Sequence, residues 1–310
     1  MSTQNRSARI TKLVNALKKH FKPVPAPKNR TLLENLLFAC LLENSSYEDA
    51  ERVFKALQTD YFDWNELRVS SKHELAEVMK PLQDPEGAAY RFKKSLHAVF
   101  ESVYAFDIEP LKKQNIGQAI KQLEKYEGTT PFVVAYVTQH GLGGHSIPVN
   151  RGLLLALVVM DVITPAEAEK NAVPGLERAV PKNKGIEVAS MLHQLGIEVG
   201  KNPYGQAARK LLLELDPTCK DRLPKRPSPA EAEKEPPKVA VSAATNAKDR
   251  KPGKASEQPR TIVKQKSEAP PSAKKVVAKK PTKRPQPPKK AATPAKKKTA
   301  SKGLVKRKPR

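Results

Sequence analysis

The sequence divides near residue 220 into two parts of opposite character. Residues 221–310 hold 28 Lys and Arg against 7 Asp and Glu, 15 of the 28 prolines, and no Phe, Trp or Tyr. A segment that is rich in proline, lacks aromatic residues and repels itself buries too little apolar surface to offset its chain entropy. We therefore expect residues 221–310 to be a disordered Lys/Pro/Ala-rich tail. Residues 1–220 are long enough to form one folded domain around a hydrophobic core.

Charge and cysteine content narrow the class of protein. The tail carries +21 of the chain's net charge of +25, so a polyanion is the expected partner. Two cysteines, Cys40 and Cys219, are too few for a disulfide framework or for a tetrathiolate metal site, so we expect no metal. The N-terminus lacks the apolar run of a signal peptide, and the longest apolar stretch, residues 153–160, is far shorter than the roughly 20 residues that cross a bilayer. We expect a cytoplasmic protein without membrane contact, which makes nucleic acid the commonest available polyanion.

Helical periodicity runs through residues 1–220. Over residues 10–21, apolar residues recur on one face of a helix and basic residues on the opposite face. Residues 32–41 carry so few polar groups that they predict the buried central helix of a bundle. Thr31 and Ser46 are expected N-caps, and Ser71 with Glu74 forms a capping box. Further helices are expected over residues 86–106, 116–123, 131–140, 148–162, 184–197 and 204–214. Some ten helices and no alternating strand pattern predict an all-α fold.

A tight turn with the sequence YEGTT follows the helix expected at residues 116–123. Pro131 at the first position of the next helix, with Thr130 as its cap, marks a well-defined helix start. The first backbone N–H groups of a helix have no partner within it, and the positive end of the helix dipole lies there, so this turn suits a phosphate. We expect nucleic-acid contacts at Lys125, Gly128, Thr129, Thr130 and, beside the start of a later helix, Arg151.

The chain from Gly128 to Asn150 resembles the helix-hairpin-helix DNA glycosylases of the endonuclease III type. Those proteins read Leu-Pro-Gly-Val-Gly, then a helix, then Val-Asp at the start of the next helix. Here Val149-Asn150 follows Gly128 at the same separation of 22 residues. The segments FACLLENSSYEDAERVFKAL and ELAEVMKPLQDPEGAAYRFKKSLHAVFE also resemble family segments. The resemblance covers residues 8–220 and implies an endonuclease III-like helical domain with its helix-hairpin-helix near residues 116–140.

The resemblance places changed residues at the positions that carry the family's chemistry. The catalytic aspartate falls on Asn150, whose amide cannot act as a general base or balance a developing positive charge. The lysine that forms a Schiff base falls on Phe132, which has no amine. The family's iron–sulfur cluster would need four thiolates where Cys219 stands alone, so no cluster is expected. The resemblance thus implies a DNA-binding protein of the base-excision-repair superfamily that has lost catalysis, in which Asn150 serves as an N-cap.

Two alternatives remain open from the residues. An active DNA glycosylase or AP lyase would need a relocated carboxylate, for which Glu43 and Asp161 are the candidates. Glu43, Asn44 and Ser45 fall where the family lines its pocket for an extrahelical base, although a polar helix end explains them as well. The second alternative is an RNA- or ribosome-associated helical module.

The C-terminal tail resembles the Lys/Ala/Pro-rich tails of linker histones and bacterial histone-like proteins. Lysines spaced by Pro and Ala bind phosphates without reading bases and release counterions. Nonspecific DNA contacts are expected at the paired and tripled lysines Lys279, Lys280, Lys289, Lys290, Lys296, Lys297 and Lys298. We expect duplex DNA as the partner, with RNA as the other possibility, and a monomeric, nucleoid-associated protein.

Overall fold

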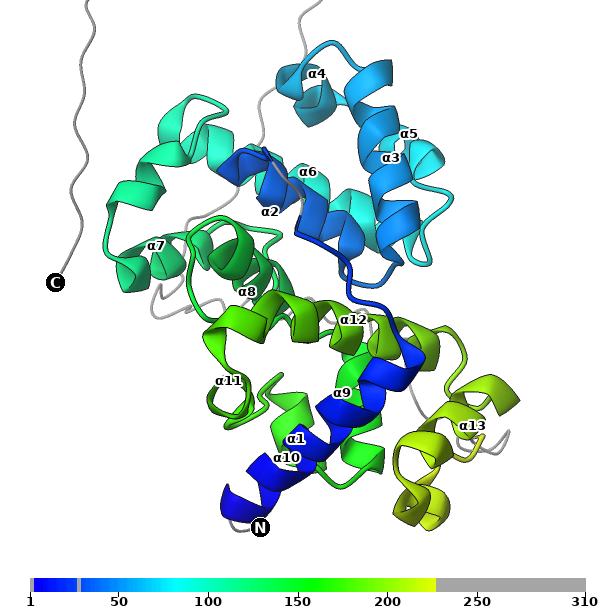
Figure 1. Ribbon diagram of the computed structural model, residues 1–310. Helices are drawn as coiled ribbons and strands as arrows, with labels where there is room; N and C mark the ends of the chain where they lie inside the picture. The colour runs from blue at the N-terminus through cyan, green and yellow to red at the C-terminus, as the bar shows by residue number, and fades with distance from the viewer. Residues whose placement is uncertain (1–2, 27–28, 227–310) are drawn as a thin grey trace, which may run out of the picture. The chain divides into compact units, whose positions relative to one another are not determined.

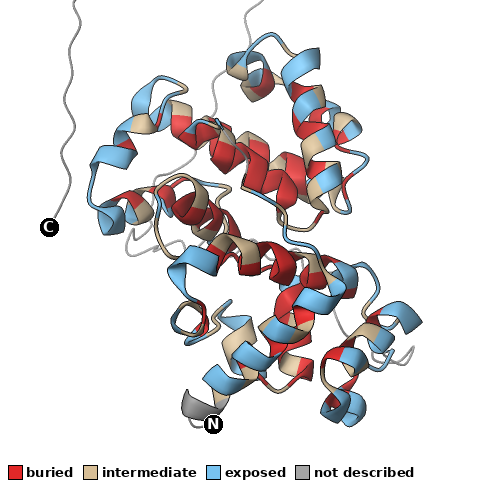
Figure 2. Cartoon of the chain, viewed as in Figure 1, coloured by how far each residue is buried: buried red, intermediate tan, exposed pale blue. Residues whose placement is uncertain are grey.

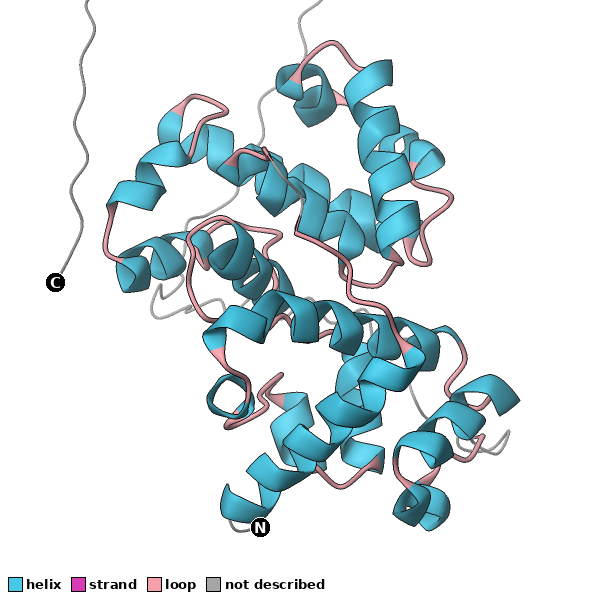
Figure 3. Cartoon of the chain, in the orientation of Figure 1, coloured by secondary structure: helices cyan, strands magenta, loops and turns pink. Residues whose placement is uncertain are grey.

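The computed structural model describes residues 3–26 and 29–226 (Figure 1), which belong to the first of two units, residues 1–239 and 240–310. These residues form helices and connecting loops without a strand, which confirms the predicted all-α class (Figure 3). None of the described helices is long and apolar enough to cross a membrane. The seven tail lysines expected to contact DNA lie outside the described residues. The division of the chain at residue 220 stays a prediction.

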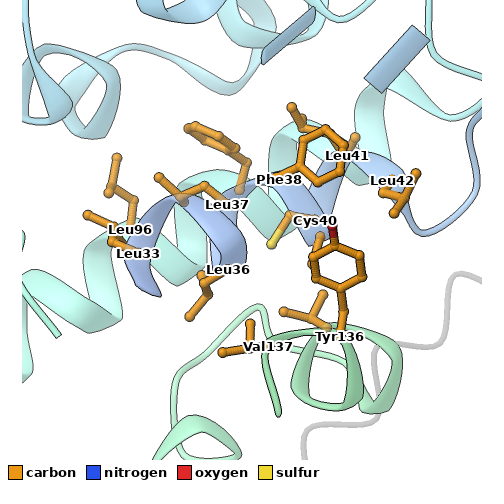
Figure 4. Close-up of a cluster of buried hydrophobic side chains, with 14 of the residues drawn as sticks. Leu33, Leu36, Leu37, Phe38, Cys40, Leu41, Leu42, Leu96, Tyr136 and Val137 are labelled. Atoms are coloured by element: carbon orange, nitrogen blue, oxygen red, sulfur yellow. The ribbon is translucent and has the colours of Figure 1, made fainter. Parts of the chain in front are cut away.

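The first hydrophobic cluster surrounds α2 (Leu32–Leu42), of which every residue except Glu34 is buried. Thr31 caps this helix in a full capping box with Glu34, so the expected cap is confirmed. Figure 4 shows leucines of α2 packed between Leu96 of α6 and Tyr136 of α8. The helices of this cluster are α3 (Tyr47–Asp60), α4 (Trp64–Val69), α5 (Lys72–Val78), α6 (Pro85–Val103), η1 (Glu109–Lys113), α7 (Ile116–Leu123) and α8 (Pro131–His140).

The second hydrophobic cluster is built on the contact between α9 (Arg151–Val159) and α12 (Gly185–Lys201). These two helices approach closely because glycines face each other: a Cβ on Gly152 would lie 1.9 Å from the carbonyl oxygen of Gly196. The remaining helices are α1 (Thr3–His20), α10 (Pro165–Glu169), α11 (Leu176–Ala179), η2 (Lys182–Lys184), α13 (Gln206–Leu215) and η3 (Pro217–Arg222). Figure 2 shows buried residues along both α9 and α12.

Local chemistry places several helix starts where the sequence predicts them, whereas the helices expected from residues 10 and 204 begin at Thr3 and Gln206. Ser46 caps α3, and Ser71 with Glu74 caps α5. The helix expected from residue 148 begins instead at Arg151, because the side chain of Asn150 accepts the hydrogen bond of Leu153 N–H and so caps the helix there. The apolar residues before Asn150 belong to an extended segment. The pattern also missed the short helices α4, α10 and α11.

Candidate nucleic-acid interface

Residues 126–130, the hairpin, join α7 to α8 and require glycine at one position. Gly128 has φ +94°, and a Cβ there would lie 2.7 to 2.8 Å from the carbonyl oxygen of Arg91, from Cβ of Lys94 and from the backbone nitrogen of Ser95. Both the left-handed backbone and the close approach to α6 exclude a larger side chain. The long helix α6 therefore supports the hairpin and holds it at the start of α8.

The hydroxyl groups of the hairpin are used within the fold. Thr129 Oγ1 donates to the carbonyl oxygens of Leu123 and Tyr126 at 2.9 and 2.8 Å. Thr130 Oγ1 accepts from Val133 N–H at 3.2 Å and caps α8 as predicted. In contrast, no atom of the described chain accepts a hydrogen bond from Gly128 N–H or Thr130 N–H. The hairpin therefore offers an incoming anion its backbone N–H groups rather than its hydroxyls.

Charged side chains lie next to the hairpin and at the start of α9. Lys125 and Arg151 are exposed, and neither forms an ion pair with another described residue. Glu127 stands where the family has proline, and its carboxylate pairs with Lys94 Nζ at 2.7 Å. That carboxylate raises the pKa of Lys94. Lys94 thus neutralises Glu127, whereas Glu124, exposed next to Lys125, lines the same pocket as Thr129 and Thr130 and has no ion-pair partner among the described residues.

The two positions that the sequence resemblance marks for chemistry, Phe132 and Asn150, meet on a histidine that the sequence analysis did not single out. Asn150 Nδ2 lies 3.3 Å from Nδ1 of His193 on α12, and the ring of Phe132 lies 5.5 Å from the imidazole ring. Nε2 of His193 lies 2.9 Å from the carbonyl oxygen of Ser45. We call Ser45, Phe132, Asn150 and His193 the His193 cluster. It gathers the first turns of α8 and α9 and the segment just before α3 around one imidazole.

Hydrogen bonding fixes the proton on this imidazole. A carbonyl oxygen can only accept, so Nε2 of His193 carries the hydrogen and donates to Ser45. Nδ1 is then the acceptor in the neutral ring, which matches the amide N–H of Asn150 as donor. Burial lowers the pKa of His193 to about 4. The neutral tautomer is therefore the form in which this cluster is packed at pH 7.

The interior of the cluster is closed by side chains. Asn150 is 2% exposed, Phe132 is 2% exposed and His193 is 1% exposed. A Cβ on Gly196 would lie 2.1 Å from Oδ1 of Asn150, so α12 presses directly on that amide. The same Oδ1 accepts from Leu153 N–H at 2.9 Å, which confirms the predicted role of Asn150 as an N-cap. Both polar atoms of the Asn150 amide thus have a partner inside the protein.

Glu43 lies beside the hairpin and is the better placed of the two candidate carboxylates. Its side chain is 16% exposed, and its carboxylate pairs with Arg91 Nε at 3.1 Å. Burial raises the pKa of Glu43, while the Arg91 guanidinium and the Thr130 hydroxyl act in the opposite direction. Arg91 also contacts Asp84 and the carbonyl oxygen of Cys40, so it joins α2 to α6.

Asp161 lies just beyond the far end of α9, away from the His193 cluster. The nine residues of α9 separate it from Asn150, which corresponds to about 14 Å along the helix axis. Its carboxylate pairs with Arg9 Nη1 at 2.7 Å, and its backbone is left-handed with φ +55°. The structure therefore does not bring Asp161 to the positions that the resemblance marks for chemistry.

The residues expected to read a flipped base are partly committed to other contacts. Ser45 is buried, and its hydroxyl accepts from Gln83 N–H at 3.2 Å while its carbonyl binds His193. Asn44 is half-buried in the turn between α2 and α3. Of the three, Glu43 alone adjoins the start of α8, through the hydroxyl of Thr130.

The cysteines do not fit a four-thiolate cluster. Cys40 is buried in α2, with Sγ 3.6 Å from the hydroxyl of Ser95, and Cys219 is buried in the other hydrophobic cluster, with Sγ 3.5 Å from the carbonyl oxygen of Leu212. In residues 3–26 and 29–226, no three His, Cys, Asp or Glu side chains gather in a way that would hold a metal ion. The expectation that no cofactor is bound stays a prediction.

Comparison with protein-family models and with curated proteins gave no match. Solved structures of DNA glycosylases are similar to the fold. One is a thermostable thymine-DNA glycosylase, with 15% identity and a TM-score of 0.45 over 62% of this chain and 86% of that one. A trapped endonuclease III–DNA covalent intermediate has 16% identity and a TM-score of 0.48 over 72% of this chain and 100% of that one.

A third similar structure is the Clostridium acetobutylicum 8-oxoguanine glycosylase/lyase in complex with dsDNA, with 11% identity and a TM-score of 0.44 over 63% of this chain and 70% of that one. What the chain does has to be argued from its own contacts.

Proposed function

We propose that the described domain binds duplex DNA through the hairpin and the starts of α8 and α9 and does not release bases. The observation that carries the proposal is the closed His193 cluster, in which the two positions of the family's chemistry serve the interior packing. Phe132 packs on the imidazole, and the side-chain amide of Asn150 caps α9 and hydrogen-bonds to His193. Neither side chain supplies a proton acceptor or an amine to a DNA strand.

The binding half of the proposal rests on the hairpin. Gly128 N–H and Thr130 N–H have no acceptor among the described residues, and exposed positive charges stand directly before the hairpin, at Lys125, and at the start of α9, at Arg151. Phosphate groups are bound in this way at helix starts, by backbone N–H groups together with the helix dipole. Such contacts position a duplex and carry no base information.

The tail, which lies outside the described residues, would add nonspecific affinity. If its lysines neutralise about ten phosphates, the slope of log K against log salt concentration is about −9. The tail would then dominate the total affinity at low salt, and the hairpin would position the domain on the duplex. For this reason, the hairpin has to be tested at elevated salt, where binding by the tail is weakest, and not by the affinity at low salt.

The test uses the full chain with duplexes that carry an abasic site, an oxidised pyrimidine, uracil or an alkylated purine. We expect binding without release of a base and without strand cleavage. Arg151→Glu should weaken binding to the duplex at elevated salt, where the tail contributes least. The matched control is Arg209→Glu, an exposed arginine on α13. Base release by the unaltered chain, or equal duplex binding by the Arg151 and Arg209 variants, would refute the proposal.

A second candidate function is a working glycosylase or AP lyase in which Glu43 supplies the carboxylate. The observation in its favour is the burial that raises the pKa of Glu43 next to the start of α8. Raised carboxyl pKa values accompany general-acid roles in enzymes. This function predicts base release from at least one lesion and its loss in Glu43→Gln. Stronger binding to RNA than to duplex DNA at equal salt would favour the RNA-associated module instead.

A further inference from the structure

A groove of about 1020 Å³ lies between α6 and α7 and reaches the hairpin at Lys125 and Tyr126. We call it the α6–α7 groove. Its volume is at the upper end of the roughly 300–1,000 Å³ of ligand sites. It is therefore large enough for a short extended segment but not for a double helix. Tyr126 and Ala98 connect it to the first hydrophobic cluster, and most of its other lining side chains are polar or charged.

The groove has an excess of positive charge. Five lysines and two glutamates line it, and two of the lysines are neutralised, Lys72 by Glu86 and Lys94 by Glu127. Lys93 uses its ammonium group to bind the carbonyl oxygens of Arg68 and Ser70, which leaves its charge uncompensated by a carboxylate. Lys121, on α7, and Lys125, two residues after its end, are exposed and have no ion-pair partner in the described chain. Two of the uncompensated charges are therefore four residues apart along this wall of the groove.

Carboxamides and an aromatic ring lie next to these charges. Gln118 and Gln122 are four residues apart on α7, so they face the same side, and both line the groove. Gln122 Nε2 donates weakly to the hydroxyl of Tyr126 at 3.4 Å, which leaves its carbonyl oxygen available. Carboxamides donate and accept, as base edges require. On the opposite wall, the half-buried ring of Tyr90 lines the groove from α6.

We propose that the α6–α7 groove binds a single-stranded nucleic-acid segment that continues from the duplex held at the hairpin. Lysine charges along α7 follow the strand's phosphates, the carboxamides meet base edges, and Tyr90 provides a surface on which a base stacks. Positive grooves with aromatic side chains bind single strands in this way without strong sequence preference. An acidic peptide would need the charges but neither the ring nor the carboxamides. The inference rests on the proposed function, because Tyr126 belongs both to the hairpin and to the groove, and Lys125 directly precedes the hairpin.

The test measures lysine acetylation in the full chain by mass spectrometry, with and without a ten-nucleotide single-stranded DNA of mixed sequence. Because each lysine is read separately, binding by the tail does not hide binding in the groove. We expect Lys121 to be protected and Lys55 and Lys80, exposed on α3 and after α5, to react at an unchanged rate. Tyr90→Ala should raise the oligonucleotide concentration that half-protects Lys121 about tenfold, the loss of one stacked base.

Two exposed glutamines give a matched pair of variants. Gln118→Glu places a carboxylate in the groove and should abolish protection of Lys121, whereas Gln206→Glu, the same change on α13, should leave it unchanged. Equal acetylation of Lys121 with and without the oligonucleotide would overturn the inference. Equal protection by an oligoglutamate of the same charge would also overturn it, because the groove would then respond to charge alone. Protection of Lys121 by an RNA strand of the same length would leave the inference standing and extend it to RNA.

The outcomes separate the groove from the proposed function. If Arg151→Glu leaves duplex binding unchanged while the single strand still protects Lys121, the hairpin proposal fails and the groove remains a site for single strands. If Arg151→Glu weakens duplex binding and Lys121 is never protected, the hairpin proposal stands and the groove inference fails.

Discussion

Acid should destabilise the domain through His193, and the size of the effect follows from the structure. The imidazole is 1% exposed and neutral, with both ring nitrogens engaged by Ser45 and Asn150. Protonating it in the folded state would place a charge in the interior and remove the acceptor that Asn150 needs. The unfolded chain has no such restriction, so it takes up the proton first as the pH falls.

The sign and magnitude follow from linkage. The pKa of His193 is about 4 in the folded state against 6.5 for a free histidine. The stability that depends on neutral His193 is therefore present above pH 6.5 and is lost as the pH falls toward 4. Between pH 7 and pH 5, these two values correspond to a loss of about 2 kcal/mol from this one residue. His140, whose pKa burial also lowers to about 4, adds a loss of the same sign.

The measurement is urea unfolding of the full chain at pH 7 and pH 5, followed by the fluorescence of the single tryptophan, Trp64, which packs near Phe54. His193→Gln removes the titrating group, and His73→Gln, at an exposed position on α5, is the matched control. The free energy of unfolding should fall between the two pH values by about 2 kcal/mol less in His193→Gln than in the unaltered chain or the control. An equal fall in all three proteins would refute the assignment of a buried neutral imidazole.

Four other substitutions test single positions, each by urea unfolding. Asn150→Asp keeps the cap but replaces the donor to His193 with a buried charge, so it should lower the free energy of unfolding by about 3 kcal/mol at pH 8. This loss should be smaller at pH 6, because the pair of the new carboxylate and His193 then gains a proton. A loss that does not depend on pH would contradict the arrangement. At Gly143 a Cβ would lie in open space, so Gly143→Ala adds only the backbone strain of φ +67° and should lower the free energy of unfolding by about 1 kcal/mol. Gly128→Ala also brings Cβ to 2.7 Å from α6 and should lower it by about 3 kcal/mol. Equal losses in the two variants would show that the hairpin does not pack tightly on α6. Thr31→Ala removes a capping bond of 3.2 Å and should cost about 1 kcal/mol, and no change in the unfolding midpoint would argue against the cap.

Features that depend on neighbouring residues could be predicted from the sequence. The capping boxes at Thr31 and Ser71, and the start of α8 at Thr130, are formed by side chains within three residues of the backbone groups they bind. Their geometry follows from residue type and spacing alone. The buried central helix was predictable for a similar reason, because a segment with almost no polar surface has to be enclosed on all sides.

The centre of the site was not predictable, because distant segments build it. His193 stands 148 positions after Ser45 in the chain, and the bond between them depends on how α12 crosses the start of α3. A single histidine on an apolar helix carries no local sign of its partners. The start of α9 was placed too early for a related reason: residues before Asn150 are apolar because an extended segment is buried there, and hydrophobicity alone does not separate this from a helix.

The closed His193 cluster explains why restoring one residue should not restore the family's chemistry. An aspartate at position 150 would still cap α9, but its carboxylate would face the lone pair of Nδ1 on an imidazole that α12 and Ser45 hold neutral. The space toward the start of α8, where an amine would have to stand, is filled by the ring of Phe132 against the same imidazole. The residues at positions 132, 150 and 193 therefore fit one another as a packed unit. A change toward catalysis at any one of them would cost stability unless the other two changed with it.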